Sequence, residues 1–354
     1  MNVCVSLLSF LVVGFKLQQP TDSPFVTTAN PRPSAYYIVY DSPKQITAKE
    51  TYTFDYPNYD ISDFQLFLAK APSMPYRQKL TTTLNLDGYG PVQYEQVEPG
   101  PLKRSMLYVR LFPNPPIRQL KLDIGYQGTL YPYHFKKGNC PYADVNLSDD
   151  VRDAYLSQDR ELTFGDPRFH NWLQQNQLVI REKEDPVEFG YRVYGFVANH
   201  INYGQGGGTN TVTNLLNPGV VRDCGGYATL FVAIMRANRI PATILCGRLA
   251  SSGDPNKPYD QMHVMAQFWA EHRGWCPIGF FDRNDDSTFG RFKGDFIVTH
   301  VGIDIGYLLR GFGGSLTRMC IGIAQGPVVF VGSNIAGGNA INTTTGQWIV
   351  NGKK

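Results

Sequence analysis

The sequence has little that would suit a metal site, a nucleic-acid surface or a membrane span. Its six cysteines include no CxxC pair, so neither a structural zinc site nor a redox dithiol is expected. The net charge of +3 over 354 residues, without a basic cluster, argues against nucleic acid as a partner. The acidic residues lack calcium-loop spacing, and the glycine-rich stretch 204–208 lacks the pattern of a nucleotide-binding loop. We therefore expect no metal and no cofactor.

Long apolar runs are also missing. The run from Val3 to Phe15 is shorter than the ~20 residues of a membrane span and matches a signal-peptide core over residues 1–15. No Lys or Arg precedes this run, although signal peptides normally begin with one, and a buried first strand would explain it as well. We expect an exported protein, periplasmic or secreted, with no integral membrane segment in the mature chain. If the run is not a signal, the protein is cytoplasmic.

The first half of the remaining sequence predicts β-structure. Residues 16–34 are polar and proline-containing and suggest a linker. Residues 35–140 contain short alternating runs separated by Pro, Gly, Asn and Asp, which is typical of a β-sandwich of immunoglobulin-like shape. A Cys…Trp…Cys pattern is absent, so this prediction concerns architecture alone.

The pattern changes to mixed helices and strands over residues 141–300. Helices are expected after Ser148 and over residues 166–177 and 185–201. The stretch 224–239 has almost no polar face and predicts a buried helix. Strands are expected to follow it, which makes this an α+β domain; they span residues 242–249, 263–269 and 274–277. Residues 301–354 form a β-rich extension that the sequence does not place.

Cys224 lies where the buried helix is expected to begin. Helix N-termini present free backbone N–H groups and a positive dipole end, which favour a thiolate and can hold an oxyanion. Gly225 and Gly226 leave room for a substrate to approach. Taken alone, Cys224 also fits a buried, unreactive cysteine.

His263 begins a strand about forty residues later, and a strand end beside a helix start would bring a base to the thiol. Taken alone, this pattern is more typical of a histidine on a strand surface. The other histidines show weaker patterns. His272 falls in an expected hairpin turn, His200 at a helix end near the expected cleft, and His134 at the end of the β-domain. His170 and His300 have no evident partner.

The motifs around these residues resemble the transglutaminase-like superfamily, with its papain-like Cys–His core. The resemblance runs through residues 222–231, 235–242, 263–268 and 274–278, in the family's order. It covers about residues 150–290. It implies a transglutaminase-like α+β domain behind the β-sandwich-like one, with Cys224 as nucleophile.

The sequence departs from the family at the third catalytic position. Gly279 stands where the family has an aspartate that orients the histidine. Asp282 is the candidate substitute, and Asp285 and Asp286 lie in an expected solvated turn. A water or a backbone carbonyl could orient His263 instead. An inactive site is the remaining alternative.

Two functions follow. In the first, Cys224 attacks an amide carbonyl of a protein or peptide and His263 transfers the proton. Water as acceptor gives a protease or amidase, slightly favoured by the resemblance, and an amine gives cross-linking. In the second, the protein is a catalytically degenerate exported binding or scaffold protein, which the glycine at position 279 favours.

Overall fold

The fold is described for most of the chain from residue 34 onward. The structure is a computed structural model that describes residues 34–56, 60–86, 89, 93–98, 100–138, 145–158, 162–204, 210–250, 262–279, 286–303, 305–310, 316–321, 327–333 and 343–350. The predicted signal, residues 1–15, and the predicted linker, residues 16–34, lie outside this range except for Ser34. Helices and strands are both present, and the strands form antiparallel sheets with one parallel exception, so the predicted α+β fold is confirmed.

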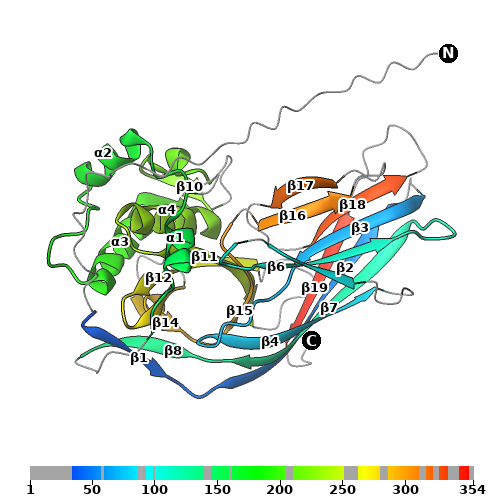
Figure 1. Cartoon of the computed structure of the whole chain (residues 1–354), viewed down its shortest axis with the longest axis horizontal. Helices are drawn as coiled ribbons and strands as arrows, with labels where there is room; N and C mark the ends of the chain where they lie inside the picture. Colours follow the sequence, from blue (N-terminus) through cyan, green and yellow to red (C-terminus); the bar gives the residue numbers. More distant parts are fainter. Residues whose placement is uncertain are drawn as a thin grey trace, which may run out of the picture.

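Two four-stranded antiparallel sheets form a β-sandwich on one side of the molecule (Figure 1). The first consists, in spatial order, of β18 (Val328–Ser333), β3 (Ile61–Ala69), β6 (Ser105–Leu111) and β5 (Gln93–Val97). The second consists of β19 (Thr343–Val350), β2 (Lys44–Asp55), β7 (Gln119–Leu130) and β4 (Gln78–Leu86). The β-rich C-terminal stretch, which the sequence did not place, therefore gives one edge strand to each sheet.

Alternating side chains explain why these strands bury one face. In β2, buried positions alternate with exposed or half-buried ones from Ile46 to Phe54, as a strand with one inward face requires. Leu122 and Ile124 of β7 continue the same pattern. The inward residues form a core that also includes Leu245, Met265 and Val298 of the second half of the chain. The sandwich is thus packed directly against the region that carries the predicted site.

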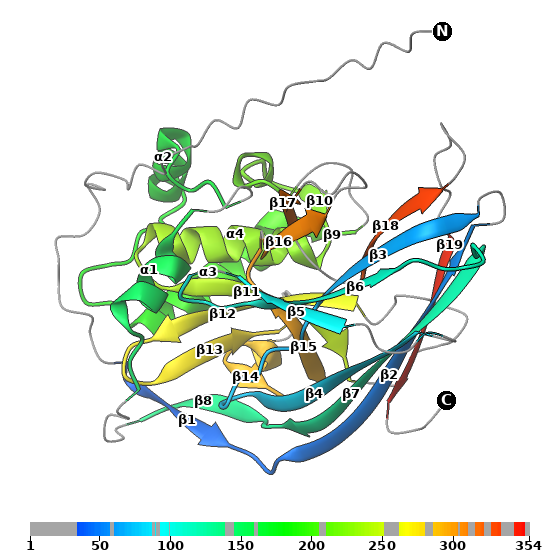
Figure 2. The same cartoon turned by 45° about the vertical axis from the view of Figure 1, so that its right-hand side comes forward.

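A central four-stranded sheet lies between helices and the sandwich. Its order is β13 (Gly274–Ile278), β12 (Met262–Ala270), β11 (Ala242–Leu249) and β15 (Phe296–Val301). Four helices gather on one side of it (Figure 1): α1 (Asp149–Leu156), α2 (Pro167–Gln175), α3 (Pro186–His200) and α4 (Cys224–Ala237). In Figure 2 the sheet lies between α4 and the long strands β2, β4 and β7.

Helix α4 is the centre of the helical layer. Every residue from Gly225 to Ala237 is buried, as the apolar sequence predicted. It packs on the inner face of β11 and β12, where Ile244, Val264 and Phe268 belong to the same core. Burial of such a face is the main stabilisation of a helix in a folded protein. This packing fixes the start of α4 relative to β12.

The other helices begin at side-chain caps, with one exception. Asp166 accepts a hydrogen bond from the Arg168 N–H before α2, and Asp185 accepts one from the Val187 N–H before α3. In each case Pro occupies the first helical turn, where its missing N–H costs nothing. Ser148 occupies the N-cap position of α1 as predicted, but its side chain makes no capping hydrogen bond.

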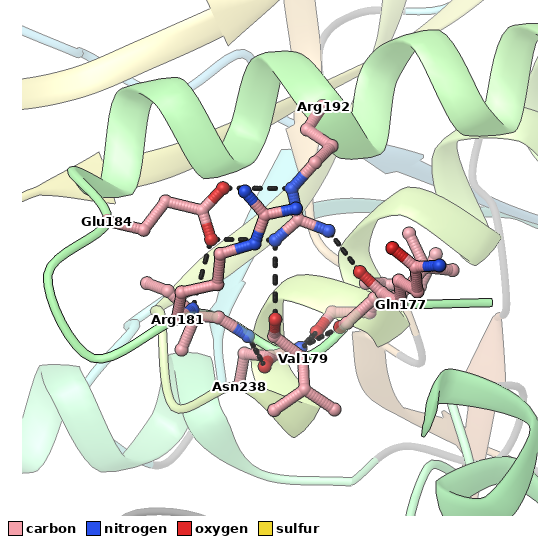
Figure 3. Close-up of polar contacts among 9 residues, drawn as sticks. Gln177, Val179, Arg181, Glu184, Arg192 and Asn238 are labelled. Carbon is pink, nitrogen blue, oxygen red and sulfur yellow. Dashed lines mark hydrogen bonds and ion pairs between the residues drawn. The ribbon is translucent and has the colours of Figure 1, made fainter. Parts of the chain in front are cut away.

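A polar network ties the α2–α3 turn to α3 and to the end of α4 (Figure 3). Arg192 of α3 binds the Glu184 carboxylate at 2.6 Å and also donates to the backbone carbonyls of Gln177 and Val179. Asn238, just after α4, accepts from the Ile180 N–H at 2.8 Å. The turn is therefore held by both helices.

Short elements complete the described chain. A three-stranded sheet joins β1 (Tyr36–Tyr40), β8 (Tyr133–Lys137) and β14 (Arg291–Phe292), and β16 (Ile305–Arg310) pairs with β17 (Leu316–Ile321). The parallel pair is β9 (Ile201–Tyr203) with β10 (Val220–Arg222), and the 3-10 turns are η1 (Val212–Leu215) and η2 (Asp286–Thr288). Among the described residues, no helix combines the length and apolar character needed to cross a membrane.

Candidate active site

Cys224 is the first residue of α4, reached through the parallel pair β9–β10. The preceding Asp223 caps the helix: its carboxylate accepts from the Gly226 N–H at 3.2 Å and from the Asn210 side-chain amide at 3.3 Å. This cap satisfies one free donor of the first turn and leaves others directed at the thiol. The thiol itself is half-buried. It is accessible enough to react, and it is buried enough for neighbouring groups to shift its pKa.

Burial raises the pKa of the Cys224 thiol above its ordinary value of 9.0. The Asp223 carboxylate raises the pKa further, whereas backbone hydrogen bonds from Val264, Gly225 and Cys224 lower it. The prediction that the helix start lowers the pKa of Cys224 is therefore wrong for the net shift. The backbone N–H groups lower the pKa as expected, but desolvation raises it by more. The resting thiol is protonated near neutral pH and needs a base.

The same contacts bring the thiol to β12. Val264, whose backbone bonds to the Cys224 thiol, is the residue directly after His263. His263 is 6% exposed and packs edge-on against Phe296, with 6.1 Å between ring centroids. Burial lowers the pKa of His263 to about 4. Its imidazole is therefore neutral near pH 7, the form that can accept a proton.

The backbone of Gly279 interacts with His263 where the family has a carboxylate. A hydrogen bond with this backbone acts to raise the pKa of His263. Only an acceptor favours the imidazolium, so the bond is from the ring N–H to the Gly279 carbonyl. A Cβ on Gly279 would lie 3.0 Å from Cβ of Thr288, which leaves little room for a side chain. This arrangement is the backbone-carbonyl alternative considered from the sequence.

Asp282, the predicted substitute for the missing aspartate, lies outside the described residues, and so does Asp285. Asp286 begins η2, but its side chain is not among those described. The involvement of a carboxylate beside His263 therefore stays a prediction. Among the described residues, no group of three or more His, Cys, Asp or Glu side chains is arranged to hold a metal ion.

The remaining histidines have other settings. His200 bonds through Nε2 to the Leu215 carbonyl at 2.9 Å and packs against Trp172, so it is structural. His272 lies in the turn between β12 and β13, as predicted. His134 lies 3.5 Å from the Asp41 carboxylate on the small sheet. His300 lies on β15 and is buried.

Sequence reasoning missed two residues that shape the site. Gly247 of β11 pairs with His263, and a Cβ there would lie only 2.0 Å from the Ile297 carbonyl oxygen. A glycine inside a strand pattern signals such a close approach. Tyr203, 72% exposed at the end of β9, has its pKa raised by partial burial and then by Cys224 and Asp223. No sequence signal placed this ring near the thiol.

Comparison with known proteins supports the family. Residues 174–280 match the family model of the transglutaminase-like superfamily, which confirms the predicted resemblance. No curated protein matches the chain. A putative cysteine protease from Cytophaga hutchinsonii is 13% identical, with 89% of this chain and 99% of that one covered at a TM-score of 0.48. The periplasmic domain of TgpA from Pseudomonas aeruginosa is 11% identical, with coverages of 64% and 86% and a TM-score of 0.34. Both TM-scores are below 0.5, so the resemblance to the superfamily rests on the family model alone.

Proposed function

We propose, from the match of residues 174–280 to the transglutaminase-like superfamily and the contacts of Cys224, that the protein is a thiol hydrolase acting on amide bonds of peptides or proteins. The observation that supports this proposal is the hydrogen bond between the Val264 backbone and the Cys224 thiol, because Val264 directly follows His263 in β12. A half-buried thiol and a neutral, buried imidazole supply a nucleophile and a base.

The proposed reaction begins with attack of the Cys224 sulfur on the amide carbonyl carbon, while the thiol proton passes to His263. The carbonyl oxygen gains negative charge and is stabilised by backbone N–H groups of Cys224 and Gly225 at the start of α4. The carbon–nitrogen bond then breaks, the amine leaves with the proton from His263, and a thioester remains. Water attacks the thioester to release the acid, and His263 again accepts and returns the proton. An amine in place of water would give cross-linking.

The Gly279 carbonyl is proposed as the group that orients His263 for both transfers. As a neutral acceptor it holds the ring tautomer but stabilises the imidazolium less than a carboxylate does. We therefore propose a Cys–His dyad, with Asp282 kept as a candidate third member. The raised pKa of Cys224 and the glycine at position 279 are also what a catalytically degenerate binding protein would have. That is the second candidate function.

Turnover of a fluorescent casein and incorporation of dansylcadaverine separate these possibilities. Wild type is expected to cleave casein, Cys224→Ala to lose turnover, and His263→Ala to lose about 10²–10⁴-fold. His134→Ala, distant from the thiol, is the matched control and should retain full rate. Dansyl incorporation in excess of cleavage would reassign the reaction as transamidation. Iodoacetamide labelling of Cys224 no faster than that of the buried Cys246 and Cys276, together with no turnover, would establish the scaffold function.

A further inference from the structure

A cavity of about 520 Å³ lies beside the central sheet, where α1 approaches the β3–β4 connection. It is enclosed by the β3–β4 connection, the start of β6, α1, and residues of β13 and β15. Tyr76 and Tyr155, two of its lining residues, pack against the sandwich core, whereas Cys224 packs against the helix core on the other face. The cavity is therefore separate from the site of the thiol. Its volume is within the range of small-ligand sites.

Aromatic rings form one wall of this cavity. Trp275 is 5% exposed and meets Tyr155 edge-on, with 4.8 Å between the ring centroids. The hydroxyl of Tyr76 accepts a hydrogen bond from Gln267 at 3.2 Å, which orients its ring. Rings fixed in this way offer an apolar surface at a low entropic cost. They suit an aromatic or large aliphatic group.

His300 contributes a buried polar atom to the lining. It is 2% exposed, and its Nε2 has no hydrogen-bond partner within the described part of the chain. A backbone hydrogen bond to Gly302 must then involve Nδ1, which donates to that carbonyl. Burial, reinforced by the Arg104 charge, lowers the pKa of His300 to about 3, so the ring is neutral. Nε2 is therefore an acceptor that calls for an N–H or O–H donor from a ligand.

The charges around the cavity have one sign. Lys70, Lys103 and Arg104 line it, and none of its described lining residues is acidic. Lys70 pairs with Glu95 at 2.6 Å, and Arg104 pairs with Glu98 at 2.6 Å. Lys103 is exposed and forms no ion pair with any residue that the structure describes. It remains available to an anion at the rim.

We propose that this cavity binds the carboxyl-terminal residue of a peptide that ends in an aromatic or large aliphatic side chain. The terminal carboxylate would pair with Lys103, the backbone N–H of the last residue would donate to His300 Nε2, and the side chain would lie against Trp275 and Tyr155. One such residue supplies an anion, a donor and an apolar group together. Cys224, His263 and Gly279 do not line this cavity, and the proposal does not depend on the reaction proposed for Cys224.

Calorimetric titration of the full chain carrying Cys224→Ala tests this site without cleavage of the probe. The probe is N-acetyl-glycyl-phenylalanine, with its C-terminal amide as the matched ligand. The free acid is expected to bind about tenfold more tightly than the amide, because a charge-assisted bond is lost. Lys103→Gln should abolish this preference, while Lys79→Gln, an exposed lysine of β4 outside the lining, should leave it intact. His300→Phe should weaken both ligands alike.

Three results would overturn the proposal: no binding of the free acid at millimolar concentration, equal binding of acid and amide, or a preference that survives Lys103→Gln. Phenylacetate binding as tightly as the peptide would assign the cavity to small aromatic acids and reject the peptide. If His300→Phe fails to fold, the surface substitution Lys103→Gln still decides the outcome. None of these results bears on casein cleavage, which tests the thiol separately.

Discussion

The two faces of the central sheet bury polar side chains in different ways. On the helix face, Arg236 donates to the Ala242 and Ser157 carbonyls at 2.8 and 2.7 Å. On the sandwich face, Arg248 of β11 meets Glu50 and Tyr52 of β2, and all three are at most 4% exposed. On the helix face, the charged Arg236 side chain thus donates to neutral backbone carbonyls. Arg248 on the sandwich face instead pairs with an opposite charge carried by a separate sheet.

The difference shows that the contact between the sandwich and the central sheet depends more on its specific side-chain partners than the contact between the helices and that sheet. A carbonyl left without Arg236 is neutral, whereas Arg248 without Glu50 is an uncompensated buried charge. Burial raises the pKa of Glu50 in spite of Arg248, so desolvation already outweighs the attraction in its effect on that carboxyl. The pair is thus a poor source of stability but a strong constraint on how β2 docks on β11.

The largest effect is expected from breaking this pair. Glu50→Gln should lower the free energy of unfolding by about 3–5 kcal/mol, measured by urea denaturation at neutral pH. Arg236→Met, the matched change on the helix face, should cost only about 1–3 kcal/mol because it leaves neutral carbonyls. Combined replacement, Glu50→Leu with Arg248→Met, should restore most of the loss. Equal losses for Glu50→Gln and Arg236→Met would remove the contrast between the faces.

A smaller effect is expected from two buried histidines of the central sheet, His263 and His300. The pKa values of His263 and His300 are about 4 and about 3, against an ordinary 6.5. The unfolded chain binds their protons first, so stability is complete above pH 6.5 and is lost as pH falls toward 4 and then 3. Each histidine contributes a slope of roughly 1.4 kcal/mol per pH unit inside its window.

Urea denaturation at steps between pH 4 and 7 measures that slope. His300→Phe should reduce it by one histidine's share, and His134→Gln, whose side chain is 33% exposed, should not change it. A slope that is identical in wild type and His300→Phe would contradict the assignment of a depressed pKa to this residue.

The smallest effect is expected at Gly279. Gly279→Ala should cost about 1–3 kcal/mol, because its Cβ would crowd Thr288 while the carbonyl that bonds His263 stays in place. Thr288→Ala should recover part of that loss. Gly279→Asp in the Thr288→Ala background should raise the pKa of His263, since a nearby carboxylate favours the imidazolium; NMR titration of the ring measures this. An unchanged pKa would show that the carboxylate does not reach the ring.

Local patterns in the sequence predicted the local elements well. The apolar run after Cys224 gave a buried helix, and residues 242–249 became β11 as predicted, because each pattern agrees with its own packing face. The family motifs predicted that Cys224 lies near the segment of His263, and a backbone hydrogen bond joins its thiol to Val264. A backbone carbonyl was one of the alternatives for orienting His263, but the sequence could not identify it as that of Gly279, because every residue carries the same carbonyl group. The pKa of Cys224 depends mainly on how far the fold buries the thiol, which the spacing of residues in the sequence does not reveal.

Long-range pairing was beyond the sequence for a different reason. β18 and β19 read as ordinary strands, and nothing in their residues indicates β3 and β2 as partners. The cavity near His300 is bounded by segments from both halves of the chain, so it exists only after they dock. Glu50 and Arg248 likewise carry no sign of each other in the sequence.

The placement of β18 and β19 has a consequence for biosynthesis. Both sandwich sheets contain strands that precede the helical region in the chain and are completed by strands that follow it. Until then, β2 and β3 each present an open edge to the crowded surroundings. The helical layer depends on contacts closer in sequence, so it can form before the sandwich sheets are completed. A nascent chain that stalls after β15 would therefore carry an assembled thiol pocket beside two unprotected sheet edges.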